Sequence, residues 1–129
     1  MKIWMICQCA SLPSSGIGMR HRHLGRELAA RGHHVSIIAA RWPHLTRHEA
    51  AADAAPQVEH FKGFRFVSLD LLHYRHAHDK WRALNWFLFA FIALGTRKLQ
   101  REKPDVVIYS SPALVGYLAA ERLARLYWE

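Results

Sequence analysis

The sequence predicts an α/β fold with a doubly wound parallel sheet, and two observations predict it. Short, nearly continuous apolar runs alternate with longer segments of helical periodicity, as expected of strands buried on both faces and joined by right-handed crossovers. The chain has 129 residues, the size of one domain, and 51% of them are hydrophobic, which argues against disorder. We therefore expect one folded unit.

The first elements follow in strict alternation. A strand is expected over residues 2–7, because this run is almost entirely apolar. A turn rich in Pro, Ser and Gly follows over 11–18, and a helix is expected over 19–31 with Gly32 as its C-terminal cap. A second buried strand is expected over 35–40.

The middle of the chain is less regular. A third strand is expected over 64–69 and a fourth over 105–109. Residues 41–57 are rich in Ala and interrupted by Pro, which fits a loop or a short helix. A long helix is expected over 80–102, ended by Pro104.

A last helix is expected to open with Ser111 as its N-cap and Pro112 in its first position, and to run to about residue 127. In the commonest order of such sheets, the third, second, first and fourth strands lie side by side. Val106, Val107 and Ile108 would then form an unpaired apolar edge, so we expect a truncated domain.

The charge balance points to anionic partners. Lys and Arg number 18 against 10 for Asp and Glu, a net charge of +8 that favours phosphates or an anionic membrane surface. No uncharged apolar stretch reaches the roughly 20 residues of a spanning helix, and no secretory signal is evident. The predicted location is the cytoplasm, with peripheral association on the inner face of the cytoplasmic membrane left open. Cys7 and Cys9 are expected to be reduced packing residues.

A glycine turn between the first strand and the first helix is the main candidate for an anion site. Gly16 and Gly18 free backbone N–H groups there, and Arg20 and His21 follow at the positive end of the helix, where cations are unfavourable unless an anion compensates. The alternative is a turn that only needs glycine and a helix whose basic residues face solvent. A nicotinamide fingerprint does not fit, because His21 stands where a third glycine would and Arg41 where an acidic residue would.

Further motifs share an order along the chain. They are Lys2-Ile3-Trp4, the Gly16/Gly18 turn, Arg20-His21, Leu24-x-x-x-Leu28, Arg31-Gly32-His33-x-Val35, Ile37-Ile38-Ala39, His44-Leu45-Thr46, Gly63-x-Arg65-Phe66, Lys103-Pro104-Asp105-Val106-Val107-Ile108 and Ser110-Ser111-Pro112. Together they resemble the N-terminal half of bacterial GT-B glycosyltransferases of family four. The later motifs resemble the branch that assembles surface polysaccharides such as O-antigen and exopolysaccharide.

The resemblance implies a truncated, Rossmann-like N-terminal half of a GT-B fold over residues 1–129, with the C-terminal donor-binding domain absent. It also implies retaining transfer of a sugar from a nucleotide-sugar donor to a lipid-linked glycan acceptor, without a cofactor or obligatory metal. The 129-residue segment alone is then expected to be inactive. The residues assigned by resemblance are Gly16, Gly18, Arg20 and His21 near the donor phosphates, and Ser110, Ser111 and Pro112 in the cleft.

No catalytic residue is assigned. Many members of the resembled family carry a histidine within or just after the fourth strand, whereas this chain has Tyr109-Ser110-Ser111-Pro112-Ala113 there. His73, His76 and His78 lack a convincing ligand set, so no metal site is expected.

The long helix carries a candidate membrane-facing surface. Its predicted core stripe is Trp81, Leu84, Leu88, Ile92 and Leu99, which leaves other aromatic residues, including Phe89, outside it. Aromatic residues framed by cations suit an anionic lipid interface, although burial of the helix all round is the alternative. The membrane candidates are Lys80, Arg82, Trp86, Phe87, Phe91, Arg97, Lys98 and Arg101.

Two other functional classes compete with sugar transfer. A stand-alone basic protein that binds a membrane surface or a partner would require the chain to be complete. A nucleic-acid-binding module is supported only by the net charge, since no recognition helix or aromatic sheet motif is evident, and nucleic acid is therefore not an expected partner.

Overall fold

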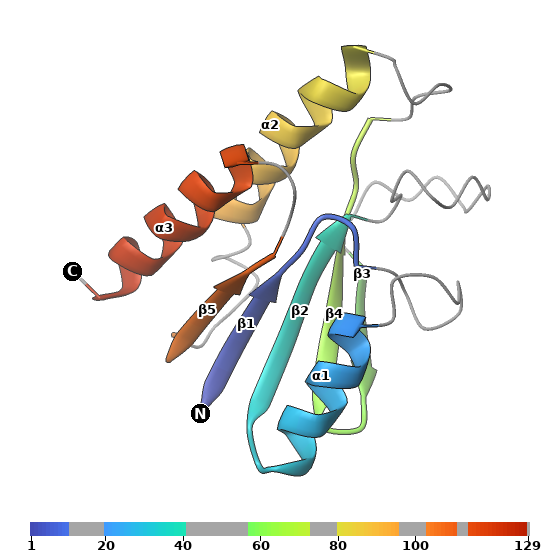
Figure 1. The fold of residues 1–129 in the computed structure, drawn as a ribbon, viewed down its shortest axis with the longest axis vertical. Coiled ribbons are helices and arrows are strands. Elements are labelled where there is room, and N and C mark those ends of the chain that lie inside the picture. Colours follow the sequence, from blue (N-terminus) through green and yellow to red (C-terminus); the bar gives the residue numbers. More distant parts are fainter. Residues whose placement is uncertain (11–19, 41–56, 73–79, 96–102, 111–113, 129) are drawn as a thin grey trace.

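A computed structural model describes residues 1–10, 20–40, 57–72, 80–95, 103–110 and 114–128 (Figure 1). Strands and helices alternate through most of the chain, as the sequence predicts. In chain order the elements are β1 (Lys2–Ile6), α1 (Arg20–Ala30), β2 (His34–Ala40), β3 (Gln57–Phe61), β4 (Phe64–Leu69), α2 (Lys80–Gly95), β5 (Val106–Tyr109) and α3 (Leu114–Trp128).

The strands form one sheet in the order β3-β4-β2-β1-β5. β1, β2, β4 and β5 are parallel, and β3 runs antiparallel to β4 (Figure 1). The four predicted strands therefore lie in the predicted order, with β1 between β2 and β5. Among the described strands, β5 pairs only with β1, so its outer side is the expected edge.

Strand β3 was not predicted from the sequence. Its Val58, Glu59 and His60 side chains are exposed, so it lacks the continuous apolar run of a strand buried on both faces. It is joined to β4 by the two residues Lys62 and Gly63, and Gly63 has a φ of 84°, in the region that favours glycine. The hairpin extends the sheet beyond β4, the third predicted strand.

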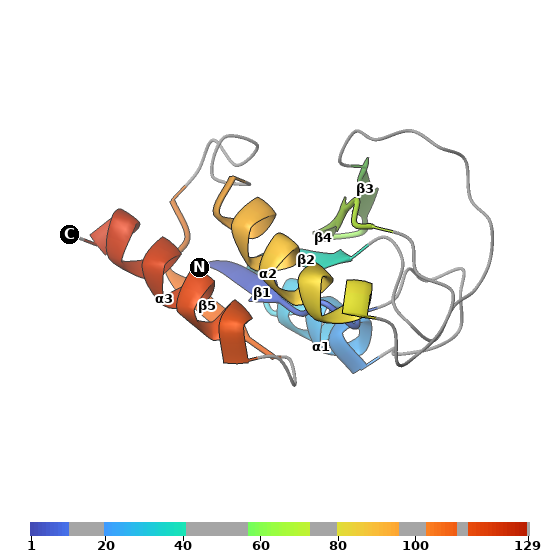
Figure 2. The same ribbon diagram turned by 90° about the horizontal axis from the view of Figure 1, so that it is seen from above.

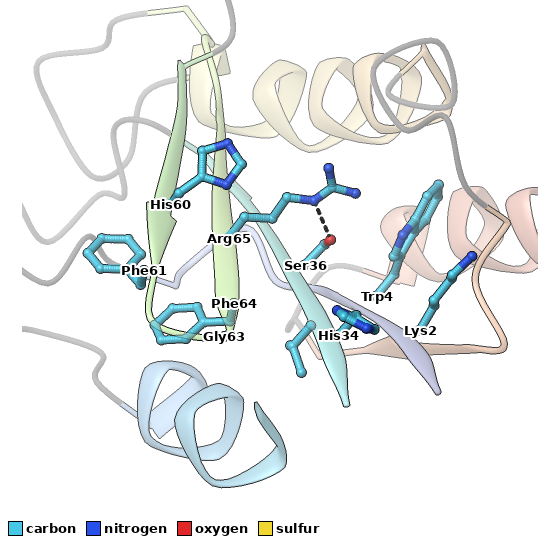
Figure 3. A pocket seen from close by; sticks show the side chains of 10 residues that line it. Lys2, Trp4, His34, Ser36, His60, Phe61, Gly63, Phe64 and Arg65 are labelled. Carbon is cyan, nitrogen blue, oxygen red and sulfur yellow. Dashed lines mark hydrogen bonds between the residues drawn. The ribbon is translucent and has the colours of Figure 1, made fainter. Parts of the chain in front are cut away.

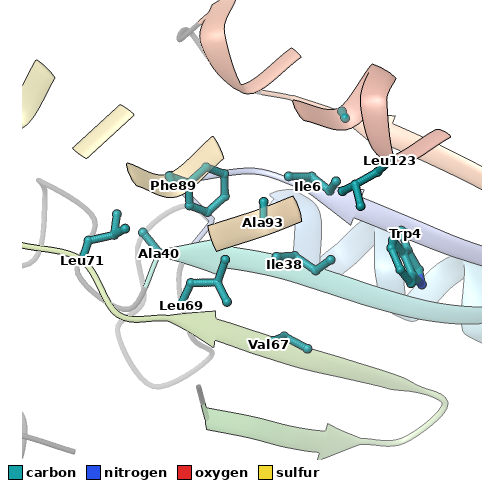
Figure 4. Close-up of a cluster of buried hydrophobic side chains, with 11 residues drawn as sticks. Trp4, Ile6, Ile38, Ala40, Val67, Leu69, Leu71, Phe89, Ala93 and Leu123 are labelled. Carbon is teal, nitrogen blue, oxygen red and sulfur yellow. The ribbon is translucent and has the colours of Figure 1, made fainter. Parts of the chain in front are cut away.

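Helices cover both faces of the sheet, which is the doubly wound arrangement (Figure 2). α1 lies on one face, where its half-buried Leu28 and Ala29 pack against a cluster that includes Met5, Ile37 and Phe66. α2 and α3 lie on the other face and pack against each other. Figure 4 shows the cluster beneath them, formed by Trp4, Ile6, Ile38, Ala40, Val67, Leu69, Leu71, Phe89, Ala93, Ala120 and Leu123.

The buried face of α2 differs from the predicted stripe. Trp81 and Leu84 are each 45% exposed, whereas Phe89, expected outside the core, is 1% exposed. The buried face consists of Asn85, Phe89, Ala90 and Ala93. Two residues of the predicted stripe, Leu88 and Ile92, do pack half-buried against the core cluster. The rest of the stripe was misplaced because this helix is apolar almost all round, so its periodicity does not select one face.

Asn85 explains how a polar residue occupies that buried face. Its Oδ1 accepts a hydrogen bond from the Leu72 backbone N–H at 3.0 Å, and its Nδ2 donates to the Leu72 carbonyl at 2.7 Å. Both polar ends of the amide are therefore satisfied, and α2 is tied to the segment that follows β4. The predicted end of this helix at residue 102, with Leu99, lies outside the described residues, as do Ser111 and Pro112 at the predicted start of α3.

Candidate substrate-binding edge

The four parallel strands end side by side at one edge of the sheet, which we call the carboxyl edge. It is formed by the ends of β1, β2, β4 and β5 and by the residues that follow them. The Cys7 N–H donates to the Ile38 carbonyl at 2.9 Å, and the Ser110 N–H donates to the Ile6 carbonyl at 2.9 Å. These bonds hold the first residues after β1 and β5 in register, at the position where α/β sheets bind ligands.

Helix α1 begins at the carboxyl edge with two predicted site residues. Arg20 is exposed and His21 is 9% exposed. Burial lowers the pKa of the His21 imidazole below its usual 6.5, and the neighbouring Arg20 guanidinium lowers it further. A neutral imidazole at the helix N-terminus removes one unfavourable cation there. Gly16 and Gly18 lie outside the described residues.

Two arginines from different helices lie near the thiols that follow β1. Burial raises the pKa of the Cys7 thiol, and the Arg20 guanidinium opposes this rise. Burial likewise raises the pKa of Cys9, with the Arg82 guanidinium opposing it. Both thiols are free, and their raised pKa values favour the unreactive protonated form. Cys7 is buried and Cys9 half-buried, in keeping with the packing role predicted for them.

The structure thus places Arg82 at the carboxyl edge, a position that was not predicted from the sequence. Arg82 was predicted to face a membrane because it flanks the apolar part of the long helix. α2 begins near the end of β4 and runs back along the sheet, so its first turn lies at this edge (Figure 1). The signal available in the sequence was the crossover itself, because a helix between parallel strands starts at their carboxyl ends.

The chemistry available at this edge is anion binding. Arg20 and Arg82 supply two guanidinium groups, and α1 adds the partial positive charge of its N-terminus. Asp70 contributes a carboxylate directly after β4. Of the predicted cleft residues, Ser110 is described and half-buried directly after β5. Within the described ranges, no group of three or more His, Cys, Asp or Glu side chains lies together as a metal site would require.

Comparison with known protein families decides the identity of the fold. The family model described as "Glycosyl transferase 4-like domain" matches residues 15–128. The chain belongs to this family. It is therefore a glycosyltransferase domain, and the five-stranded sheet with three described helices is its Rossmann-like fold. The family indicates a sugar donor and a glycan acceptor as substrates. A search of curated proteins finds no significant match.

The glycosyltransferase domain also exposes an apolar stripe on the outer side of α2. Leu84, Phe87 and Phe91 are 45%, 58% and 76% exposed, and their spacing of three and four residues continues from the exposed Lys80. Two of the predicted membrane candidates, Phe87 and Phe91, therefore point to solvent. Trp86 and Arg82 are half-buried, and Arg97, Lys98 and Arg101 lie outside the described residues. Among the helices described, none is both long and apolar enough to cross a bilayer.

Proposed function

We propose that the chain is the acceptor-side, N-terminal domain of a retaining glycosyltransferase, and that the diphosphate of a nucleotide-sugar donor meets the carboxyl edge. The observation that carries this is the placement of Arg20 and His21 at the start of α1, beside the residues that follow β1. A helix N-terminus and a guanidinium group both favour a phosphate anion, and an anion would offset the cation that opens this helix.

The neutral His21 gives the proposal a specific signature. Burial and Arg20 disfavour its charged form in the free protein. A diphosphate bound at the start of α1 would favour the charged form and raise the pKa of His21. This rise would be visible as a changed NMR titration of the His21 ring.

The direct test is a titration of the chain with uridine diphosphate, followed by amide NMR shifts. Arg20→Gln is expected to weaken binding about ten- to a hundredfold, because a charge-assisted hydrogen bond is worth about 1.5–3 kcal/mol. Arg26→Gln is the matched control, since Arg26 is an exposed cation on the same helix. Equal effects of the two substitutions would show that only net charge matters. Several nucleoside diphosphates should be compared, because the base is not specified by this edge.

The wider pathway is part of the same proposal. We place the reaction in bacterial surface-polysaccharide synthesis, with a lipid-linked glycan as acceptor and most donor contacts made by a second domain. This follows the order of motifs from Lys2 to Pro112, which resembles that branch. The 129-residue chain is then expected to bind a nucleoside diphosphate but to transfer no sugar. Sugar transfer by the purified chain would contradict the assignment of donor chemistry to a second domain.

Contact with an anionic membrane is a second element of the proposal, and the exposed α2 stripe favours it. Leu84, Phe87 and Phe91 present apolar side chains beside Lys80, the combination found in helices that lie at a lipid interface. Such a contact would bring a lipid-linked acceptor to the domain. The cation would add about 1 kcal/mol of attraction to an anionic surface.

Sedimentation with vesicles tests this membrane contact. We expect binding to vesicles that contain phosphatidylglycerol and little binding to neutral phosphatidylcholine vesicles. The Phe87→Ala, Phe91→Ala double variant should lose most of the binding. Val58→Ala, an exposed apolar residue on β3, is the control and should bind normally. Equal binding to both vesicle types, or none, would remove the membrane contact from the proposal.

A further inference from the structure

A second cationic region lies at the opposite end of the sheet from the carboxyl edge. On the face covered by α2 and α3, apolar side chains occupy the half of each strand nearer the carboxyl edge. At the amino ends of the parallel strands, and at the adjoining end of antiparallel β3, most of the same alternating positions are polar. They are Lys2 on β1, His34 and Ser36 on β2, Arg65 on β4 and His60 on β3.

Strand register brings these side chains together. Trp4 pairs with Ser36, Ser36 with Arg65, and Arg65 with His60, so the four form one row across the sheet. Lys2 pairs with His34 in the row nearer the amino ends. Because side chains two residues apart share a face, both rows point to the same side. Residues distant in the sequence therefore converge on one cationic surface.

This surface lines a cavity, which we call the amino-end hollow. Its volume is about 370 Å³, within the roughly 300–1,000 Å³ of small-molecule sites. Figure 3 shows Arg65 reaching over β2 toward Trp4, with His60 on one side and Lys2 and His34 toward the amino ends of their strands. The lining is Lys2, Trp4, His34, Val35, Ser36, His60, Phe61, Gly63, Phe64 and Arg65.

The Arg65 side chain is held in place. Its Nε donates a hydrogen bond of 2.8 Å to the Ser36 Oγ, and Ser36 itself is 5% exposed. This bond fixes the plane of the guanidinium group, so less rotamer entropy is lost when an anion binds. Trp4 is 2% exposed and packs edge-on against Tyr127 of α3, with ring centroids 5.4 Å apart. The side of the hollow next to Arg65 is therefore rigid.

The ionisable side chains that line the hollow are all basic. None of its lining residues is acidic. Asp105 accepts a hydrogen bond from the Lys2 backbone N–H at 2.7 Å, which places this carboxylate at the margin of the hollow. Glu59 pairs with Phe66, whose side chain belongs to the cluster under α1, so it lies on the opposite face. The lining of the hollow thus combines an oriented guanidinium, an ammonium and two imidazoles.

We propose that the amino-end hollow is a second binding site, for a small phosphate ester, with Arg65 as the main anchor of the phosphate. A guanidinium matches the geometry of phosphate oxygens, and Lys2 and His34 supply further donors on the same face. The volume accommodates an organic part as well as the phosphate, and Trp4, in the same row as Ser36 and Arg65, provides an apolar wall for it. Four residues along β2 separate Ser36 from Ala40, roughly 13 Å, so this site is distinct from the carboxyl edge.

The ester can be free or the headgroup of a lipid, and two probes distinguish these sources. Free glycerol 3-phosphate carries the phosphomonoester alone, whereas vesicles that contain phosphatidic acid present it on a membrane. The first experiment is a titration of the whole chain with glycerol 3-phosphate, followed by amide NMR shifts. We expect saturable shifts at residues 34–36 and 64–65. Amide shifts confined to Arg20 and His21 would overturn the proposal. The absence of saturable binding with both glycerol 3-phosphate and phosphatidic acid vesicles would also overturn it.

Substitutions then test the assigned anchor. Arg65→Gln is expected to weaken binding at least tenfold, and Arg65→Lys should recover part of the loss. Lys62→Gln removes the same charge from an exposed position in the adjacent hairpin turn and should change binding less than twofold. Equal weakening by Arg65→Gln and Lys62→Gln would refute a defined site.

Two further measurements keep the test decisive if Arg65→Gln lowers stability. Ser36→Ala removes only the oxygen that orients Arg65 and should weaken binding about threefold while the fold is retained; unchanged binding would contradict the role of that bond. Phosphatidic acid vesicles that bind in an Arg65-dependent manner, when the free ester does not, would identify the lipid headgroup as the ligand. The donor site is tested separately through Arg20, so either proposal can fail alone.

Discussion

Replacing Gly63 with alanine is expected to lower the free energy of unfolding by about 2–5 kcal/mol. Gly63 has a φ of 84°, where a residue with a Cβ is strained by about 1–2 kcal/mol. A Cβ placed there would also lie 2.7 Å from the Cβ of Ala29, about 1 Å closer than carbon atoms prefer. Neither group has a rotatable side chain, so α1 and the hairpin must separate, which adds about 1–3 kcal/mol.

Gly32 provides the matched control for this prediction. It has nearly the same φ, 85°, but a Cβ there would meet no atom within 4 Å. Gly32→Ala should therefore show only the backbone strain, about 1–2 kcal/mol. Urea unfolding followed by circular dichroism gives both free energies. The difference between the two variants isolates the contact between the hairpin and α1.

A double-mutant cycle with Ala29→Gly tests the contact directly. Ala29→Gly alone should cost about 1 kcal/mol of helix propensity, but in the Gly63→Ala background it removes the clash. The coupling energy should equal the steric part, about 1–3 kcal/mol. Similar losses for Gly63→Ala and Gly32→Ala, or a coupling energy near zero, would refute the reasoning.

Three further predictions concern α2 and α1. Phe89→Ala should lower the free energy of unfolding by about 3–5 kcal/mol, because Phe89 is 1% exposed. The exposed Phe91 is the control, and Phe91→Ala should change that free energy by less than about 0.5 kcal/mol. Equal costs of the two variants in urea unfolding would contradict the assigned face of α2. Asn85→Ala removes both hydrogen bonds to Leu72 and should cost about 1–3 kcal/mol, with faster hydrogen exchange of the Leu72 amide; unchanged exchange would disprove the anchor. The pKa of His21 is lowered in the folded state, so the unfolded state binds more protons, and stability should fall as the pH drops through 6.5 toward that lower pKa. His21→Gln should remove this part of the pH dependence, and a stability difference between wild type and variant that is constant from about pH 5 to about pH 8 would count against it.

Most of the sheet could be predicted from the sequence because buried parallel strands leave a strong signal. The runs around Ile3, Ile37 and Val107 have at most one polar interruption, the run around Phe66 is broken by Arg65 and Ser68, and their order followed from crossover rules. Strand β3 could not be found this way, since exposed side chains such as His60 give it no continuous apolar run. The short spacing to β4 through a glycine was the available hairpin signal.

The face of α2 was beyond the reach of periodicity. Leu84 and Phe89 are both apolar, and only the sheet beneath decides that Phe89 is buried and Leu84 exposed. Asn85 added to the error, because a buried polar residue is recognised only once both of its hydrogen bonds are known. Tertiary packing, rather than local pattern, selected this face.

For the candidate sites too, local sequence pattern predicted one part and tertiary structure decided the other. Arg20 and His21 were predicted as an anion site from their position after the glycine turn, and the structure places them at the start of α1 at the carboxyl edge. The amino-end hollow was not predicted, because Lys2, His34 and Arg65 are far apart in the sequence and meet only through strand register. Clusters made across a sheet carry no signal in sequence spacing.

The central position of β1 has a consequence for synthesis on the ribosome. β1 is translated early, yet its pairing with β5, and the bond from the Lys2 amide to the Asp105 carboxylate, join residues 103 positions apart. At about 5–20 residues per second, the nascent chain must wait roughly 5–20 s before that neighbour is made. During this interval the middle of the future sheet is an open edge, so the growing chain needs protection from aggregation there rather than at its finished border.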